Sequence, residues 1–365
     1  MNFDVQVAHS ITEIGPDVWD RLGGGQPFTG YHWYRFGERA LSADRPLHIL
    51  LADGGEPVAR ATFWLRRREP LPISSPVARR AMDAILQRWP LLICQAPLVS
   101  ATSLVLPPPP RCAAALEALS GVAHDWARRL GASFLLYPYL EPSEVGWSGW
   151  PEDLVPVTVP DPGTRLILHW PDFDSYVRQL PKSGRKDYRR HRNRAAAQGI
   201  ELDRHSRVTD LDEALALIRN VEAHHSSIPN PWARAMLENA HLVAADWLTA
   251  RIGGRLVGCG LLLGDGDVRF LALLGLDYEV RYVYFQLLYG AIRCAIEGGV
   301  GILRGGAGAY DIKRRLGFQL ESNNNLVFTG GRAWIRALGR WLVRTEASQP
   351  ARPARPAATA HSGGR

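Results

Sequence analysis

Several features that would assign this 365-residue chain to a class are missing from its sequence. No run of about 18 apolar residues occurs, so no transmembrane helix is predicted. The opening residues, Met-Asn-Phe-Asp-Val-Gln, lack the basic and apolar segments of a secretory signal peptide. The cysteines are scattered, with no CxxC pair and no histidine at ligand spacing, and are predicted to be buried, reduced thiols: Cys94, Cys112, Cys259 and Cys294. These absences predict a cytoplasmic protein without disulfides, structural zinc or a bound cofactor.

What the chain does contain is typical of a soluble globular protein. Apolar residues make up 46% of it, and its length favours two domains of about 150 residues each. The formal charge of +7 is unevenly placed, because residues 182–194 and 331–365 each hold seven basic residues and one acid. The rest of the chain is therefore mildly acidic, and each basic segment is expected to serve an anion.

The most informative stretch runs from about residue 246 to residue 318. Strands are predicted at 247–252, 255–263 and 268–275, joined at Gly253-Gly254 and at residues 264–266, where glycine supplies the positive φ of tight hairpins. Residues 282–297 have apolar residues at helical spacing. A strand at 302–303 then leads into a glycine-rich turn, a short basic helix and a further strand. The crossover is expected to place the new strand beside the last strand of the meander.

This order of elements resembles the core of the GNAT acyltransferase fold. The glycine-rich strand end, followed by Tyr310, Lys313, Gly317 and Phe318, is similar to the branch of Fem-type aminoacyl-tRNA transferases and FemAB-like or BioF-like acetyltransferases. The resemblance implies an α/β fold with two GNAT-like domains in tandem, each a mixed, mostly antiparallel sheet flanked by helices. It covers most of residues 1–330, better in the second half than in the first.

The domain boundaries follow from composition. We expect an N-terminal GNAT-like domain at 1–150 and a C-terminal catalytic domain at 151–330, with the Pro-, Gly- and Trp-rich stretch 141–162 as the connection. An amphipathic basic helix is expected at 331–347, where Arg332, Arg336, Arg340 and Arg344 recur at steps of four. It would either cover the second domain or meet an anionic membrane. The tail 348–365 is expected to be disordered.

Residues around the glycine-rich turn are the main candidates for chemistry. Gly305, Gly306 and Gly308 follow a strand, where ligands bind in many α/β sheets, although a tight turn also needs glycine. The resemblance gives Lys313 a role in transfer, in which its ammonium stabilises developing negative charge. Tyr310 would act as an acid toward the leaving group. The alternatives are a solvated helix lysine and a packing tyrosine.

The turn after the third meander strand departs from the GNAT pattern. GNAT enzymes bind the pyrophosphate of acyl-CoA there through successive glycines. Here no glycine follows Gly275, the turn carries Asp277 and Glu279, and its one basic residue is Arg281. Fem-type transferases share this departure, so the resemblance leaves the donor open between acyl-CoA and aminoacyl-tRNA.

Two further segments are candidates. Residues 182–194 form a basic helix with Arg185, Arg189 and Arg192 on one face, predicted to bind the phosphates of an anionic substrate such as tRNA or a nucleotide-linked precursor. The alternative is a solvated helix. His224, at a helix end, is the candidate base for the acceptor amine, with Asp277 and Glu279 as rivals.

The predicted function is transfer of an acyl group from acyl-CoA to a primary amine, directly, because no nucleophile elbow is present. Two alternatives stay open. One is a Fem-type aminoacyl-tRNA-dependent transferase acting on a peptidoglycan precursor or a secondary metabolite. The other is a non-catalytic binding protein on the same scaffold. The acceptor and the oligomeric state are not predicted.

Overall fold

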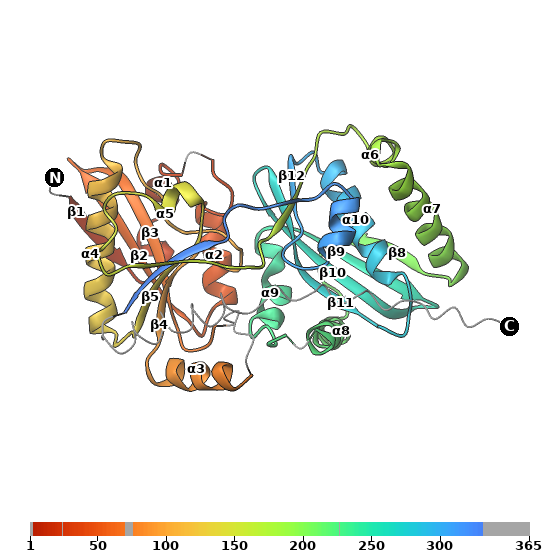
Figure 1. Cartoon of the computed structure of the whole chain (residues 1–365), viewed down its shortest axis with the longest axis horizontal. Coiled ribbons are helices and arrows are strands. Elements are labelled where there is room, and N and C mark those ends of the chain that lie inside the picture. The colour runs from red at the N-terminus through yellow and green to blue at the C-terminus, as the bar shows by residue number, and fades with distance from the viewer. Residues whose placement is uncertain (1–2, 24, 70–75, 226, 331–365) are drawn as a thin grey trace.

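The computed structural model describes residues 3–23, 25–69, 76–225 and 227–330. Two mixed sheets of seven strands lie side by side along the long axis of the molecule, each flanked by helices (Figure 1). We call them the first and second units. The predicted α/β architecture with two mixed, mostly antiparallel sheets is confirmed.

The first sheet has the order β1-β2-β3-β4-β5-β14-β6. Its strands are β1 (Asp4–Ala8), β2 (Arg45–Asp53), β3 (Glu56–Arg66), β4 (Leu91–Cys94), β5 (Phe134–Leu140), β6 (Val155–Thr158) and β14 (Asn325–Gly330). The helices of this unit are η1 (Ile11–Glu13), α1 (Pro16–Trp19), α2 (Tyr31–Ala40), α3 (Pro76–Arg88), α4 (Cys112–Arg129) and α5 (Pro142–Val145). Strands β4 and β5 are parallel, and the other neighbours are antiparallel.

The second sheet has the order β13-β7-β12-β11-β10-β9-β8. Its strands are β7 (Thr164–Ile167), β8 (Glu201–His205), β9 (Ala244–Ile252), β10 (Arg255–Asp265), β11 (Val268–Leu276), β12 (Ile302–Arg304) and β13 (Gln319–Leu320). The helices are α6 (Phe173–Gln179), α7 (Lys182–Ala197), α8 (Leu211–His224), α9 (Ala233–Asn239), η2 (Ala240–Leu242), α10 (Val283–Glu297) and α11 (Tyr310–Arg315). As predicted, β12 lies beside β11 and parallel to it.

Two strands in the first sheet come from unexpected places. The stretch expected as a connection contains β6, and β14 follows the whole second unit before it inserts between β5 and β6. The blue strand that returns to the left-hand sheet in Figure 1 is this element. The units are therefore tied by more than one crossing of the chain. The domain boundaries at residues 150 and 330 stay a prediction.

A shared apolar core joins the units. Trp33 and Phe36 of α2 belong to the same buried cluster as Met236 of α9 and Leu261 of β10. Across the seam, the ring of Phe28 meets that of Phe270 edge to face at 5.5 Å. Burial of large aromatic side chains is the strongest driving force for association. The seam resembles the interior of one domain, so the relative position of the units is fixed by packing.

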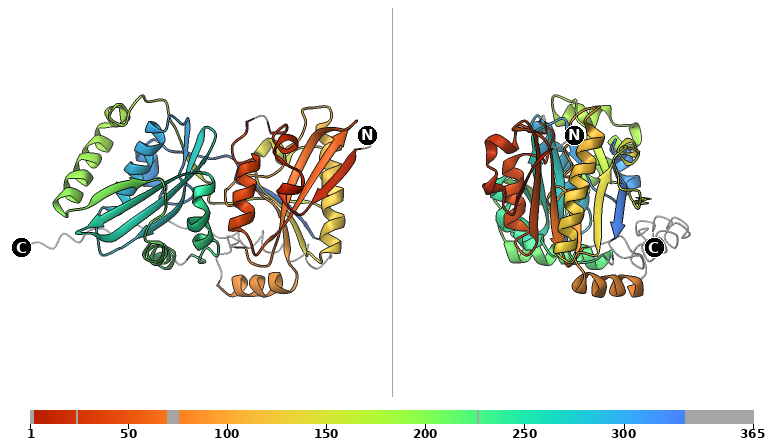
Figure 2. Two further views of the ribbon diagram at one scale, coloured as in Figure 1. Left: turned by 180° about the vertical axis from the view of Figure 1, so that it is seen from behind. Right: turned by 90° about the vertical axis from the view of Figure 1, so that its left-hand side faces the viewer.

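The second sheet is covered on both faces. Leu217 and Ile218 of α8 pack with Cys259 of β10 in the core shared with the first unit, whereas Leu287 and Ile292 of α10 pack in a separate cluster on the other face. Helices α6 and α7 lie outside α10, at the end of the molecule far from the first unit (Figures 1 and 2). Residues on α7 and on α8 are thus separated by the sheet.

Some local predictions need correction. Asp210 directly precedes α8, a position typical of a capping side chain, but its backbone is left-handed and its carboxylate pairs with Arg251 instead of capping the helix. All four cysteines are free thiols; Cys112 is only partly buried, and the other three are buried. The predicted basic helix at 331–347 and the disordered tail at 348–365 lie outside the described residues. No helix among the described residues is long and apolar enough to cross a bilayer.

Candidate active site

The parallel strands β11 and β12 part at the site. Their pairing ends at Phe270 and Arg304, and β11 continues alone on that side from Leu271 to Leu276. At the same point β12 passes into the glycine-rich loop 305–308. An unpaired strand edge offers backbone N–H and C=O groups to an extended ligand. This opening is therefore a natural place for a chain-like substrate to bind.

Lys313 holds the loop from inside. Its side chain is only 5% exposed, and its ammonium donates to three loop carbonyls, those of Gly305 at 2.7 Å, Gly306 at 3.0 Å and Ala307 at 3.3 Å. An ammonium has three donors, so its hydrogen-bonding capacity is satisfied by the loop. Lys313 is not a solvated helix lysine; it fixes the conformation of residues 305–307.

The charge of Lys313 is held in a desolvated place. Burial lowers the pKa of Lys313 to about 8, and the Glu321 carboxylate opposes part of that shift. Desolvation disfavours the charged form of a lysine, while a nearby carboxylate favours it. The residue therefore changes its charge just above neutral pH.

The glycines of the loop serve different needs. A β-carbon on Gly305 would lie 2.9 Å from both Phe318 and Thr164, so this position is packed too tightly for a side chain. Gly306 and Gly308 have φ of +67° and +83° with open space around them, and glycine is needed there for its dihedral angles. The tight turn is thus real, and the loop backbone also borders a cavity at Gly306.

The amides of the loop are available. Among the hydrogen bonds of the described residues, none engages the backbone N–H of Gly306 or Ala307, whereas the N–H of Gly305 donates to the Thr164 carbonyl at 2.7 Å. The carbonyls of these residues are already turned toward Lys313. Unpaired backbone donors beside a buried positive charge can stabilise a developing oxyanion.

Tyr310 is also engaged. Its hydroxyl donates to the Pro162 carbonyl at 2.9 Å, and burial raises the pKa of Tyr310. It helps to fix the segment that enters β7. Its assignment as an acid stays a prediction.

A cavity of about 270 Å³ lies between the units at this loop. From the first unit, Arg66 and Glu69 face it as an ion pair of 2.7 Å. From the second, Arg304 and Glu321 face it with both carboxylate oxygens held, at 2.5 and 2.9 Å. The cavity therefore has polar walls that belong to both units, with Gly306 at its edge.

Arg66 is the most enclosed of these charges. It is 1% exposed, lies 3.2 Å from Asp44 as well as close to Glu69, and stacks over the Trp232 ring at 4.7 Å. Burial raises the pKa of Asp44 to about 6, against the effect of Arg66. None of the four cavity charges was predicted from sequence, because each lies in an ordinary strand or loop with no motif around it.

The turn after β11, where GNAT enzymes bind the pyrophosphate of acyl-CoA, is not an open phosphate-binding loop in this protein. Asp277 pairs with Arg255 at 2.8 Å and accepts the Glu279 amide at 3.0 Å, so its carboxylate stabilises the turn. Arg281 is exposed. The missing glycines therefore correspond to a turn held by its own side chains, beside the N-terminus of α10.

The basic helix α7 separates its residues into two faces. Tyr188 and His191 are buried against α10, where the His191 ring stacks on Phe285 at 3.8 Å and burial lowers the pKa of His191. Arg185 donates to the Leu180 carbonyl at 2.6 Å. Arg189 and Arg192 are exposed.

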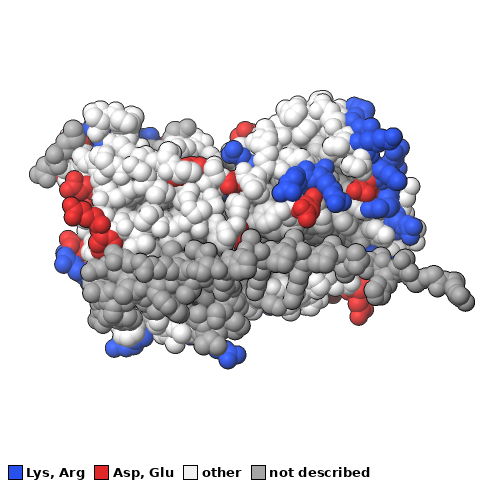
Figure 3. Space-filling model, viewed as in Figure 1, with Lys and Arg blue, Asp and Glu red and all other residues white. Residues whose placement is uncertain are grey.

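Exposed cations of α7 and α11 form one surface, which we call the basic face. Asp187 connects the two helices, since it pairs with Arg190 and lies 4.0 Å from Arg315. The members are Lys182, Lys186, Arg189, Arg190, Arg192, Arg194, Arg314 and Arg315. Figure 3 shows Lys and Arg gathered over α7 at the right-hand end of the molecule. This surface lies on the α10 side of the second sheet.

His224 is on the other side of that sheet, at the exposed end of α8. Its ring stacks on Tyr278 at 3.9 Å, and Tyr278 also contacts His225. His224 lines neither of the cavities described in this article. The structure thus brings Lys313, Tyr310 and the glycine loop together, but leaves His224 and the arginines of α7 on opposite faces.

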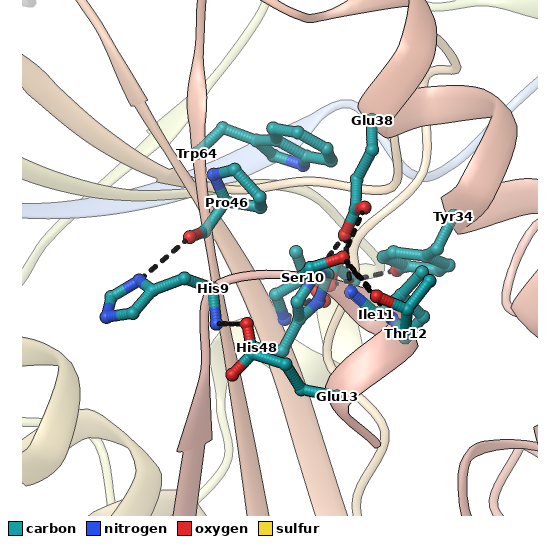
Figure 4. Close-up of polar contacts among 12 residues, drawn as sticks. His9, Ser10, Ile11, Thr12, Glu13, Tyr34, Glu38, Pro46, His48 and Trp64 are labelled. Atoms are coloured by element: carbon teal, nitrogen blue, oxygen red, sulfur yellow. Dashed lines mark hydrogen bonds and ion pairs between the residues drawn. The ribbon is translucent and has the colours of Figure 1, made fainter. Parts of the chain in front are cut away.

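The first unit contains a hydrogen-bonded polar network that resembles a catalytic triad but is closed to substrate. His48 bonds to Thr62 at 2.8 Å and to Glu38 at 2.9 Å, the order of a nucleophile–base–acid relay. Figure 4 shows Glu38 of α2 reaching His48 of β2, with Ser10 and the Ile11 amide on the same carboxylate. His48 and Thr62 are both fully buried, so no substrate reaches them. The group is structural.

Within residues 3–23, 25–69, 76–225 and 227–330, no group of three or more His, Cys, Asp or Glu side chains is arranged to hold a metal ion.

Comparison with known proteins agrees with this geometry. Residues 182–314 match the family described as an acetyltransferase (GNAT) domain. No curated protein has a matching sequence. The solved structure of FemX is similar with a TM-score of 0.56 and 10% identity over 88% of this chain and 96% of that one.

Two further structures share the fold. A tandem GNAT protein from the clavulanic acid biosynthesis pathway has a TM-score of 0.54 and 14% identity, over 90% of this chain and 98% of that one. L-PGS from Bacillus licheniformis has a TM-score of 0.51 and 9% identity, over 92% and 96%. At such identities the likeness concerns the fold.

Residues 182–314 form a GNAT acetyltransferase domain, and by this domain the protein is a transferase. The whole chain shares its fold with FemX and with the tandem GNAT protein.

Proposed function

We propose that the protein is an N-acyltransferase that moves an acyl group from acyl-CoA to a primary amine at the cavity between the units. The observation that carries the proposal is the clamp of Lys313 on three carbonyls of the loop where β11 and β12 part. It leaves the amides of Gly306 and Ala307 free beside a buried charge.

The reaction follows from this arrangement. The amine nitrogen attacks the thioester carbonyl, the N–C bond forms, and the oxyanion is stabilised by the two loop amides. The C–S bond then breaks, the thiolate leaves, and the amine proton passes to solvent. Lys313 acts as a positioning residue with a charge, because its donors hold the loop. The carboxylates of Glu69 and Glu321 are already paired with arginines, so we do not assign the base to them.

The direct test uses purified full-length protein with labelled acetyl-CoA and a mixture of primary amines. Formation of a labelled amide that free CoA suppresses supports the proposal. Absence of transfer from acetyl-CoA and from longer acyl-CoA donors contradicts it.

The basic face favours a second candidate, an aminoacyl-tRNA-dependent transferase acting on a peptidoglycan precursor or a secondary metabolite. Among the described residues, the eight exposed cations form ion pairs only with Asp187 and Asp311, which suits a phosphate backbone. This candidate predicts transfer from charged tRNA that ribonuclease abolishes and that falls steeply with salt. A parallel assay with charged tRNA therefore separates the two donors.

A further inference from the structure

A second cavity, larger than the one at the glycine loop, lies in the first unit and plays no part in the proposed transfer step. It has a volume of about 850 Å³ and is lined by the proline run 107–110, by Leu104 and by the ring of Trp147. Cavities of this size hold a whole small ligand. The apolar walls favour a ligand with a hydrocarbon or flat body.

The charge of this cavity has one sign. Its lining includes Glu141 and Glu144, and no lysine, arginine or histidine is among the described residues that line it. Neither carboxylate is in an ion pair with a described residue. Each caps α5 instead: Glu144 accepts the Glu141 amide at 2.6 Å, and Glu141 accepts the amide of Glu144 in return.

The pair is partly desolvated. Burial raises the pKa of Glu144, the hydrogen bond from the Glu141 amide opposes this shift, and the charge of the Glu141 carboxylate adds a smaller rise. Like charges held together in a low-dielectric place are relieved by a cation. Aromatic rings such as that of Trp147 also favour an ammonium group. A site with these walls would select an organic cation over an anion or a neutral molecule.

The cavity adjoins the transfer site. Tyr139 lines both cavities, Ser100 lines the smaller and Ala101 the larger. Between the two cavities, the Ser100 carbonyl accepts hydrogen bonds from Arg304 at 2.8 Å and from Asn323 at 3.0 Å. Residues of the second unit thus hold the wall that separates the cavities. A ligand that passes Tyr139 would therefore reach from the glutamates toward the loop at Gly306.

Building on the proposed function, we infer that the acceptor carries two amino groups. One remains an ammonium between Glu141 and Glu144 in the larger cavity, and the other extends past Tyr139 to the transfer site. The reacting amine and the anchoring charge must be different groups, because the glutamates and the loop amides border different cavities. The substrate class is thus an aliphatic diamine or a molecule with an equivalent second basic group. In the step itself the free amine forms the N–C bond, the C–S bond breaks, and the released thiolate is protonated.

The test measures binding without any acyl donor. Calorimetry on the full-length protein compares straight-chain α,ω-diamines of increasing length with monoamines of the same length. We expect a diamine of suitable length to bind about tenfold or more tightly than its monoamine. This difference in affinity corresponds to one additional charge contact in a partly buried site. The Glu141→Gln and Glu144→Gln double variant keeps groups that can cap α5 but removes the charge. It should bind both amines at the monoamine level.

Controls keep this test independent of folding and of the proposed function. Glu152→Gln removes an exposed carboxylate outside the cavity and should leave diamine binding unchanged. Equal affinity for diamine and monoamine, or unchanged diamine affinity in the thermally stable double variant, would overturn the inference. Diamine binding without transfer from any acyl donor would refute the proposed function and leave the cavity assignment standing. Transfer to amines that is unchanged in the double glutamate variant would refute the cavity assignment and leave the proposed function standing.

Discussion

The two units have the same order of core strands and differ at the end of the parallel strand. In the first, the antiparallel order β1-β2-β3-β4 is followed by α4 and the parallel strand β5; in the second, β8-β9-β10-β11 is followed by α10 and the parallel strand β12. The end of β5 carries Tyr139 and is followed by the two glutamates of the acidic cavity. After β12 comes the glycine loop held by Lys313. The same topological position thus carries the wall of a cavity in one unit and the loop held by Lys313 in the other.

The buried polar groups differ in the same way. The Glu38–His48–Thr62 group of the first unit has no access to a ligand, whereas the clamp of the second unit borders a cavity at Gly306. A buried network that is fully satisfied rigidifies a core, and the same chemistry becomes functional only where a cavity reaches it. Under the proposed function, the first unit binds the acceptor and the second unit transfers the acyl group.

The largest expected effect concerns the seam between the units. Arg66→Ala leaves Asp44 and Glu69 buried without their cation, and removing one partner of such a group costs about 3–5 kcal/mol. Denaturant unfolding should show a loss in this range, with Arg66→Lys between the variant and the parent. A loss below about 1 kcal/mol would mean that the charges at the seam are solvated.

Lys313→Ala should show most clearly that transfer depends on the second unit. It removes the charge and leaves three loop carbonyls without a donor, so we expect kcat to fall by about 10²–10³-fold, as for the loss of an oxyanion donor. Steady-state kinetics with acetyl-CoA measures this, and circular dichroism checks the fold. Unchanged kcat in a folded variant would show that transfer does not depend on the loop held by Lys313.

The same residue predicts a pH dependence. Lys313 has a pKa of about 8 in the folded protein, against an ordinary value of 10.5. The ammonium is therefore complete below pH 8 and is lost above it, so kcat should fall with an apparent pKa of about 8. For stability the sign is opposite. Between pH 8 and 10.5 the unfolded chain binds the extra proton, so the contribution of Lys313 to the free energy of unfolding rises with pH. Both trends should vanish in Lys313→Met.

His48→Gln tests the closed group of the first unit. Leaving Glu38 or Thr62 without its partner should cost about 1–3 kcal/mol of unfolding free energy, with kcat and KM unchanged. Because burial lowers the pKa of His48, its contribution to stability is present above pH 6.5 and is lost as pH falls below that value. A drop in kcat with intact stability would give this group a catalytic role.

The smallest effect is expected on the basic face. Arg189 and Arg192 are exposed, so replacing both with Gln should change the unfolding free energy by no more than about 0.5 kcal/mol per residue. Transfer from acetyl-CoA should not change. If charged tRNA is the donor instead, the double variant should bind RNA more weakly and with a smaller salt slope.

The sequence predicted the meander, the crossover helix and the parallel strand of the second unit well, because hairpin glycines and helical spacing are local signals. It could not predict that β14 returns to the first sheet, since pairing between residues 325–330 and β5 depends on contacts far apart in the chain. It singled out Lys313 but not its three carbonyl partners. Arg66 and Glu321 carried no motif, and only the meeting of the units gives them a place at the site.

The central claim is that the loop held by Lys313 is where acyl-CoA and an amine react. The most direct measurement is single-turnover transfer from labelled acetyl-CoA to a primary amine, with the parent protein and folded Lys313→Ala side by side. The account predicts a labelled amide with the parent and a rate at least about 10²-fold lower with the variant. Equal rates, or transfer from charged tRNA alone, would contradict it.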